Sequence, residues 1–304
     1  MENLELPMCL LDWIDKDKLS WNYLSYNSNA IKLLRKNLDK INWTNLSENP
    51  NAIELLKENP NKINWYNLSR NPNAIDLLRE NPNKINWVAL SLNPNAEAIA
   101  LLRENPDKID WYYLSRNPND IQLLRENPDK IIWDCLSANP NAIDLLRENP
   151  DKINWYWLSS NPNAIALLRK NLDKIYWDCL SLNPNAEAMA LLQENPDKIN
   201  WYWLSSNPKA EAIQLLKENP DKIIWYCLSQ NPNAEAIQLL KENQDEIYWT
   251  HLSYNPSIFT YDYEKMRKNM LLFKEDLMKE RFHPHNLRKF SSWGHNGGID
   301  DDNE

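Results

Sequence analysis

The feature that most constrains the fold is a tryptophan that returns every 22 or 24 residues along most of the chain. Each of these tryptophans is followed by serine four residues later and by asparagine six residues later. The eleven members of the series are Trp21, Trp43, Trp65, Trp87, Trp111, Trp133, Trp155, Trp177, Trp201, Trp225 and Trp249. A fixed period of this length is typical of repeat proteins, in which one unit cannot bury its apolar side alone and neighbouring units stack.

Each repeat predicts two short helices, and residues 71–92 serve as the example. Asn71 suits an N-cap, and the proline that follows it suits the first position of a helix. A helix of about ten residues is therefore expected to follow. A second asparagine–proline pair, at Asn81, ends that helix because proline cannot continue it. After a tight turn, Asn86 can cap a shorter helix that begins at Trp87.

Composition supports an all-helical chain. The sequence has 304 residues and only three glycines, all of them after Ser292, whereas a β-rich protein uses glycine at its turns. We therefore predict an all-α protein, an α-solenoid of about eleven short helix-turn-helix repeats with N- and C-terminal caps. At roughly 10 Å for each stacked helix pair, the repeats would form an extended rod or arc on the order of 100 Å long.

Four segments follow from this pattern. They are an N-terminal cap over 1–20, a tandem-repeat solenoid over 21–256, C-terminal capping helices over 257–293 and a disordered acidic tail over 294–304. The first residues lack the basic region and apolar run of a secretory signal, so we expect a protein that is not secreted.

Three of the four cysteines recur at one repeat position, and they are Cys135, Cys179 and Cys227. They belong to repeats two units apart, which in a stacked array exceeds the Cα separation of about 7 Å that a disulfide allows. We expect them to be buried free thiols in a reducing compartment.

The repeat pattern W-x-x-L-S-x-N-P-N-A-I-x-L-L-x-x-N-P-x-K-I resembles that of tandem-repeat proteins that are numerous in giant nucleocytoplasmic large DNA viruses. The segment YDYEKMRKNM, followed by FHPHNLRKF, is similar to the closing segment of those proteins. The resemblance covers residues 10–293. It implies a viral protein located in the host cytoplasm or in the virion, and it implies little about activity.

Several columns of polar residues recur in almost every repeat. Asparagines before the first proline and at the end of the longer helix are expected to cap helices and to bond backbone groups. Lysine and arginine columns could follow a phosphate backbone. However, acidic residues stand beside the arginines and the net charge is −9, which favours a solvated, ion-paired face and makes nucleic acid an unlikely partner.

The two positions after each tryptophan vary from repeat to repeat, and repeat proteins commonly bind partners through such positions. The candidate aromatic face comprises Tyr112, Tyr113, Tyr156, Trp157, Tyr202, Trp203 and Tyr226. Aromatic side chains are favoured anchors at interfaces. The alternative is that the second position fills gaps between helices, since its order from Cys135 to Cys227 alternates small and large side chains. Both interpretations stand at this point.

The sequence contains no phosphate-binding glycine loop and no catalytic motif such as G-x-S-x-G or H-E-x-x-H. We expect no enzyme, no cofactor and no metal site. The favoured function is a protein–protein interaction scaffold in a large DNA virus, whose partner is an unidentified viral or host protein rather than a membrane. The alternatives are a virion structural component that self-associates and, more weakly, a nucleic-acid-binding protein that uses the lysine and arginine columns.

Overall fold

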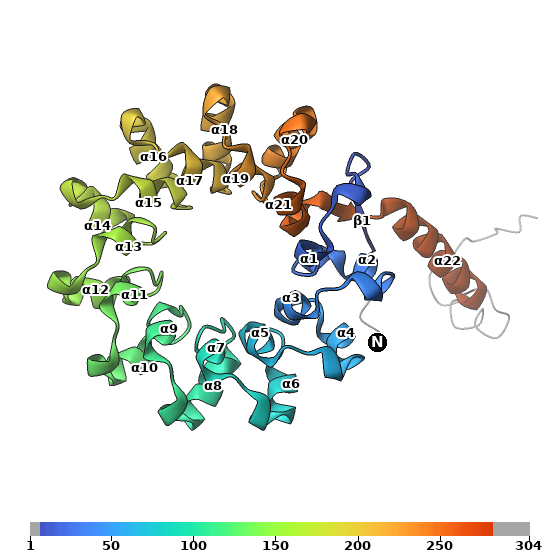
Figure 1. The fold of residues 1–304 in the computed structure, drawn as a ribbon, viewed down its shortest axis with the longest axis horizontal. Coiled ribbons are helices and arrows are strands. Elements are labelled where there is room, and N and C mark those ends of the chain that lie inside the picture. The colour runs from blue at the N-terminus through green and yellow to red at the C-terminus, as the bar shows by residue number, and fades with distance from the viewer. Residues whose placement is uncertain (1–6, 282–304) are drawn as a thin grey trace, which may run out of the picture. The chain divides into compact units, whose positions relative to one another are not determined.

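A computed structural model of the chain describes residues 7–281 (Figure 1). The predicted tail over 294–304 and the end of the predicted capping segment, over 282–293, lie outside the described residues. The chain divides into two compact units. One is Leu10–Phe259, and the other combines Met1–Cys9 with Thr260–Glu304. The described part is an all-α solenoid of short helical repeats, as predicted.

Within Leu10–Phe259, each repeat contributes one helix that begins at its tryptophan. We call these the inner helices, because they lie toward the centre of the ring of repeats in Figure 1. They are α1 (Trp21–Leu24), α3 (Trp43–Glu48), α5 (Trp65–Arg70), α7 (Trp87–Ser91), α9 (Trp111–Arg116), α11 (Trp133–Ser137), α13 (Trp155–Ser159), α15 (Trp177–Leu182), α17 (Trp201–Ser206), α19 (Trp225–Ser229) and α21 (Trp249–Tyr254).

A second layer of helices lies behind the first, and we call these the outer helices (Figure 1). They are α2 (Ile31–Arg35), α4 (Ile53–Lys57), α6 (Ile75–Glu80), α8 (Ala96–Glu104), α10 (Ile121–Glu126), α12 (Ile143–Glu148), α14 (Ile165–Arg169), α16 (Ala186–Glu194), α18 (Ala210–Glu218) and α20 (Ala234–Glu242). Each of these outer helices is followed by a 3₁₀ turn of three residues that leads to the next inner helix, such as Pro82–Lys84.

The unit of Met1–Cys9 and Thr260–Glu304 contains most of a small sheet and one longer helix. Strands β1 (Met8–Leu10) and β2 (Phe259–Tyr261) pair with each other. Helix α22 (Tyr263–Arg281) follows, and Asp262 begins it by accepting a hydrogen bond from the backbone N–H of Lys265 at 2.9 Å. No helix within the described residues is both long and apolar enough to cross a membrane.

The start of the outer helices differs from the prediction. In a 22-residue repeat Asn71 is the C-cap of α5, not an N-cap, and the outer helix has six residues because a turn occupies 72–74. In the four 24-residue repeats the two extra residues convert that turn into helix, so that α8 has nine residues and Asn95 caps it. The expected ten-residue helix is therefore wrong for the short repeats and nearly right for the long ones.

Leucines form the core between the two layers. The leucine three residues after each repeat tryptophan is almost completely buried, and this column is Leu24, Leu46, Leu68, Leu90, Leu114, Leu136, Leu158, Leu180, Leu204, Leu228 and Leu252. Each such side chain contributes roughly 1.5–3 kcal/mol when it leaves water. Because helices of four to nine residues are marginal alone, this packing between repeats is what stabilises them.

A buried asparagine ladder links every repeat to the one before it. In the sixth repeat, the Asn139 side-chain amide donates hydrogen bonds to the backbone carbonyls of Ser115 at 3.1 Å and Asn117 at 2.7 Å. The side-chain carbonyl oxygen of Asn139 accepts a hydrogen bond from the backbone N–H of Asn141 at 3.0 Å. The same contacts to the preceding repeat are made by Asn27, Asn49, Asn71, Asn93, Asn117, Asn139, Asn161, Asn183, Asn207, Asn231 and Asn255. The predicted structural role of this column is thereby confirmed, although its main contacts join repeats rather than cap helices.

The serine four residues after each repeat tryptophan also links successive helices. The Ser137 hydroxyl donates to the Trp133 carbonyl at 2.9 Å and accepts from the backbone N–H of Asn154, in the next repeat, at 3.0 Å. Serine thus satisfies a donor at the start of the following inner helix, where helix N–H groups lack partners within the helix.

The first repeat packs on the last one, which closes Leu10–Phe259 into a ring (Figure 1). The contacts are those found between successive repeats. The backbone N–H of Ser20 donates to the Ser253 hydroxyl at 2.8 Å, and the Asn27 amide donates to the carbonyls of Ser253 and Asn255. Lys18 lies over the Trp249 ring, 5.0 Å from its centroid. The expected extended rod is therefore wrong, because the end faces of the solenoid cover each other.

Candidate binding surface

The exposed side of the inner helices faces the centre of the ring. Each inner helix has another inner helix on either side and outer helices behind it (Figure 1). The residue that follows the repeat tryptophan lies on the remaining, solvent-exposed side, whereas the leucine two residues further on is buried. The variable positions predicted to bind a partner therefore stand on the inner surface of the ring.

The structure exposes nearly all of the predicted aromatic face. Exposure ranges from 36% for Trp157 to 55% for Tyr112, and the exposed members are Tyr112, Tyr156, Trp157, Tyr202, Trp203 and Tyr226. Tyr113 is half-buried, with its ring edge-on to Tyr112 at a centroid distance of 5.2 Å. These residues come from α9, α13, α17 and α19, so they are distributed around one side of the ring rather than gathered at one point.

The position two residues after the repeat tryptophan has two roles, gap filling in some repeats and an exposed aromatic ring in others. Cys135 and Cys227 are buried between helices, as gap-filling predicts. Trp157 and Trp203, in the alternate repeats, keep more than a third of their surface exposed and stand beside exposed tyrosines. The small side chains thus fill gaps, while the large ones remain available for contact.

Tyrosine hydroxyls bond the cysteine of the next repeat. Tyr112 hydrogen-bonds Cys135, and Tyr156 hydrogen-bonds Cys179 in the same manner. Burial raises the pKa of both thiols above its ordinary value, more than the tyrosine hydrogen bond lowers it. Because a nucleophilic cysteine needs a depressed pKa, these thiols have structural rather than catalytic chemistry. Cys135, Cys179 and Cys227 form no disulfide, as expected, but Cys179 is half-buried rather than fully buried.

Three further aromatic residues on this surface were missed by the sequence analysis. Tyr176 stands edge-on to Tyr156 at 5.4 Å, and Tyr248 stands edge-on to Tyr226 at 5.6 Å. His251 lies 4.0 Å from the Tyr226 ring, measured between centroids. Tyr176 and Tyr248 directly precede the repeat tryptophan, where five of the eleven repeats have a capping asparagine, and that substitution could have identified them. We define the inner aromatic surface as Tyr112, Tyr113, Tyr156, Trp157, Tyr176, Tyr202, Trp203, Tyr226, Tyr248 and His251.

The inner aromatic surface carries little charge. At the two variable positions of all eleven repeats, the only charged residues are Asp134 and Asp178. Burial lowers the pKa of His251 below its ordinary value, and the Nδ1 atom of His251 is buried without a hydrogen-bond partner. Burial therefore favours the neutral form of His251, and the two variable positions add only two negative charges to this surface.

The lysine column has a different role from the one predicted. Instead of forming only ion pairs, seven of these amines lie over the ring of a repeat tryptophan, at 4.6–5.0 Å from the ring centroid. The lysines are Lys18, Lys40, Lys84, Lys108, Lys152, Lys174 and Lys198. Each cation–π contact contributes about 0.5–1 kcal/mol at an exposed site. Lysine and tryptophan thus recur with the same period because they contact each other.

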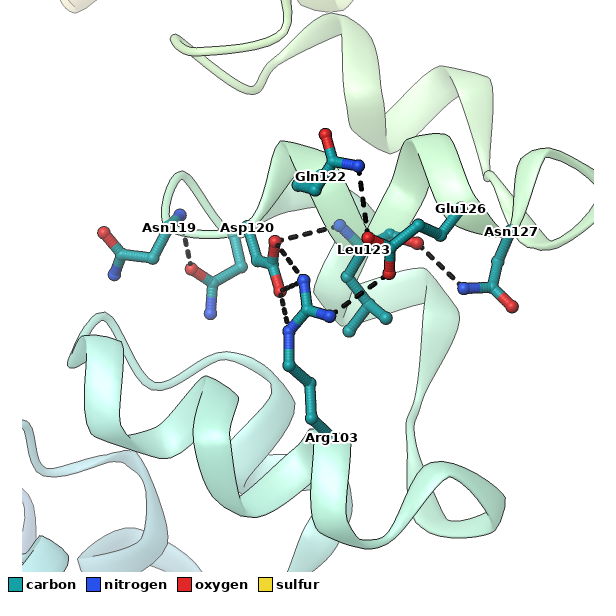
Figure 2. Close-up of polar contacts among 8 residues, drawn as sticks. Arg103, Asn119, Asp120, Gln122, Leu123, Glu126 and Asn127 are labelled. Atoms are coloured by element: carbon teal, nitrogen blue, oxygen red, sulfur yellow. Dashed lines mark hydrogen bonds and ion pairs between the residues drawn. The ribbon is translucent and has the colours of Figure 1, made fainter.

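Most arginines of the outer helices pair with acids of the next repeat, whereas Arg147 pairs with Asp144 of its own helix. Figure 2 shows the most elaborate case, in which the Arg103 guanidinium bonds both oxygens of Asp120 at 3.0 Å and also reaches Glu126. Asp120 replaces the alanine found at this position in most repeats. It is 7% exposed, and it caps α10 by accepting from the backbone N–H of Leu123 at 2.9 Å.

Comparison with known proteins yields no match to a family model, to a characterised protein or to a solved structure. The fold and the surface define the chain as an α-solenoid of helical repeats, closed into a ring within Leu10–Phe259 and exposing aromatic side chains on its inner helices.

Proposed function

We propose that this chain is a non-enzymatic interaction scaffold that holds a viral or host protein on the inner aromatic surface. One observation carries the proposal. Tyrosine and tryptophan side chains are exposed at variable positions of the inner helices, on a scaffold whose asparagine and serine contacts repeat without change. Rigid aromatic rings of this kind dominate the binding energy of many interfaces.

The size of the ring indicates what part of a partner would fit. With eleven inner helices at a spacing of about 9 Å, the helix axes lie on a circle about 30 Å across. Side chains extend about 5 Å from each axis, which leaves about 20 Å for a partner. One or two helices, or an extended segment, would fit in that space, whereas a whole domain would not.

The resemblance of the repeats to giant-virus proteins supports a viral origin and a location in the host cytoplasm or the virion. A self-associating virion subunit is the alternative. Assembly through the solenoid ends is disfavoured, because the first and last repeats occupy each other's end faces. Nucleic-acid binding through the lysine and arginine columns is disfavoured, because many of these cations lie over tryptophan rings or pair with acids.

The test is affinity purification from infected cells with wild-type chain and with a Tyr156→Ala/Trp157→Ala/Tyr202→Ala/Trp203→Ala variant. A Leu38→Ala/Leu172→Ala variant is the matched control, because it removes two other exposed apolar side chains. Circular dichroism must first establish that both variants retain the helical content of the wild type.

The proposal expects one specific partner that is lost with the aromatic variant and retained with the control. Recovery of only capsid or core proteins, unaffected by the aromatic substitutions, would favour the virion-subunit alternative. Light scattering coupled to gel filtration then separates the two functions, because the scaffold is expected to be a monomer and the subunit an oligomer.

A further inference from the structure

Two tyrosine–tryptophan pairs of the inner aromatic surface have the same geometry. Tyr156 and Trp157 stand edge to face, with ring centroids 5.2 Å apart and an interplanar angle of 86°. Tyr202 and Trp203, two repeats further on, have a centroid distance of 5.1 Å and an angle of 90°. The two tryptophans are also exposed to almost the same extent.

The polar groups around the two pairs also match. Asn154 accepts hydrogen bonds from the backbone N–H groups of the first pair and donates to the Asp134 carboxylate at 2.8 Å. Asn200 accepts from the N–H groups of the second pair and donates to Asp178, again at 2.8 Å. Each pair is therefore linked, through one asparagine side chain, to an exposed carboxylate of the preceding repeat.

The pairs differ in the presence of a cation over the tryptophan ring. The Arg116 guanidinium lies over the Trp157 ring, 5.5 Å from its centroid, and reaches there from two repeats earlier. The residue that stands two repeats before Trp203, at the same repeat position as Arg116, is Ser160. Its short side chain instead donates to the Trp157 carbonyl at 2.9 Å.

We propose that Trp203 binds the guanidinium of an arginine from the partner protein, in the position that Arg116 of this chain holds over Trp157. This inference rests on the proposed function, because it requires that a partner occupy the inner surface. The Trp203 site, defined as Ser160, Asp178, Tyr202 and Trp203, offers the ring face and a carboxylate to the incoming group.

Charge favours an arginine over the other groups that stack on tryptophan. A nucleic-acid base would bring a phosphate toward Asp178, in a protein of net charge −9. Arginine is preferred over lysine, because its planar guanidinium stacks on an aromatic face and bonds a carboxylate with two donors. The chain itself uses arginine, not lysine, at the filled site.

The test follows the tryptophan indole N–H resonances of the full chain, labelled with ¹⁵N at tryptophan, during titration with the peptide acetyl-Gly-Arg-Gly-amide. The control peptide carries citrulline, which has the shape of arginine without its charge. Trp203→Phe assigns the resonance. Two further variants reverse the occupancy of the two sites. Ser160→Arg supplies a cation to Trp203 from the chain itself, and Arg116→Ser removes the cation over Trp157.

The proposal expects the Trp203 resonance to shift saturably with the arginine peptide and at least twofold less with the citrulline peptide. Ser160→Arg should abolish the shift, and Arg116→Ser should add a second responsive resonance, from Trp157. An equal response to both peptides, no response, or an undiminished response in a folded Ser160→Arg chain would overturn it.

The partner experiment separates this inference from the proposed function. If the four-residue aromatic variant loses the partner while Ser160→Arg retains it with unchanged affinity, the arginine site is wrong and the interaction surface stands. If the aromatic variant also retains the partner, both are wrong. If Ser160→Arg weakens partner binding and the arginine peptide responds as expected, both stand.

Discussion

Replacing one asparagine of the ladder should destabilise the protein far more than an exposed substitution would. Asn139→Ala removes two hydrogen bonds to the carbonyls of Ser115 and Asn117 and one from the N–H of Asn141. Asn139 is fully buried, so water reaches these backbone groups poorly. Each unsatisfied buried group costs about 1–3 kcal/mol, which gives a loss of about 3–5 kcal/mol if the structure partly relaxes.

The assay is urea unfolding followed by far-ultraviolet circular dichroism. The matched control is Asn149→Ala, because Asn149 is half-buried at the end of α12 and its amide makes one hydrogen bond, to the Leu145 carbonyl at 2.9 Å. That substitution should cost about 0.5–1.5 kcal/mol. If Asn139→Ala costs no more than Asn149→Ala, the account of the ladder as the main polar link between repeats is wrong.

Three other perturbations test parts of the account. Ser137→Ala should cost about 1–3 kcal/mol in urea unfolding, because it leaves the backbone N–H of Asn154 without its acceptor; a neutral result would contradict the serine's role. Asp120→Ala restores the residue of most other repeats, yet should still cost about 1 kcal/mol through the lost helix cap and the partly exposed Arg103 pair, whereas a gain in stability would refute this. His251 has a lowered pKa through burial, so its contribution is fully present above the unfolded pKa of about 6.5 and is lost as pH falls toward the folded-state pKa. Unfolding at pH 7.5 and pH 5 should show a larger acid loss for the wild type than for His251→Gln, and equal losses would contradict the assignment.

Much of the fold could be predicted, because local chemistry determines the elements of each repeat. The cap at Asn86, the inner helix that follows it and the turn at Pro82–Lys84 are all present. The predicted start of the outer helix was wrong, because an asparagine–proline pair is compatible with a turn as well as with an N-cap. Ring closure could not be predicted, because it depends on the small rotation between repeats summed around the circle, and no local pattern specifies that angle.

The candidate surface was predicted in outline from the variation between repeats. What the sequence could not show is how side chains of different repeats meet. Arg116 belongs to the fifth repeat and covers a tryptophan of the seventh, which only the curvature of the ring permits. The lysine–tryptophan contacts were missed because the two residues stand near opposite ends of the repeat pattern.

The central claim is that the eleven repeats close into a ring and so place the aromatic residues around one centre. The most direct measurement is the distance between spin labels at Asn22→Cys and Thr250→Cys, in a chain whose native cysteines are replaced. Both positions are exposed, and each follows its repeat tryptophan, in the first and the last repeat. The ring predicts neighbouring helices about 10 Å apart, to which the label arms add their length. A separation approaching 100 Å, the span of an open stack of eleven repeats at about 10 Å each, would contradict it.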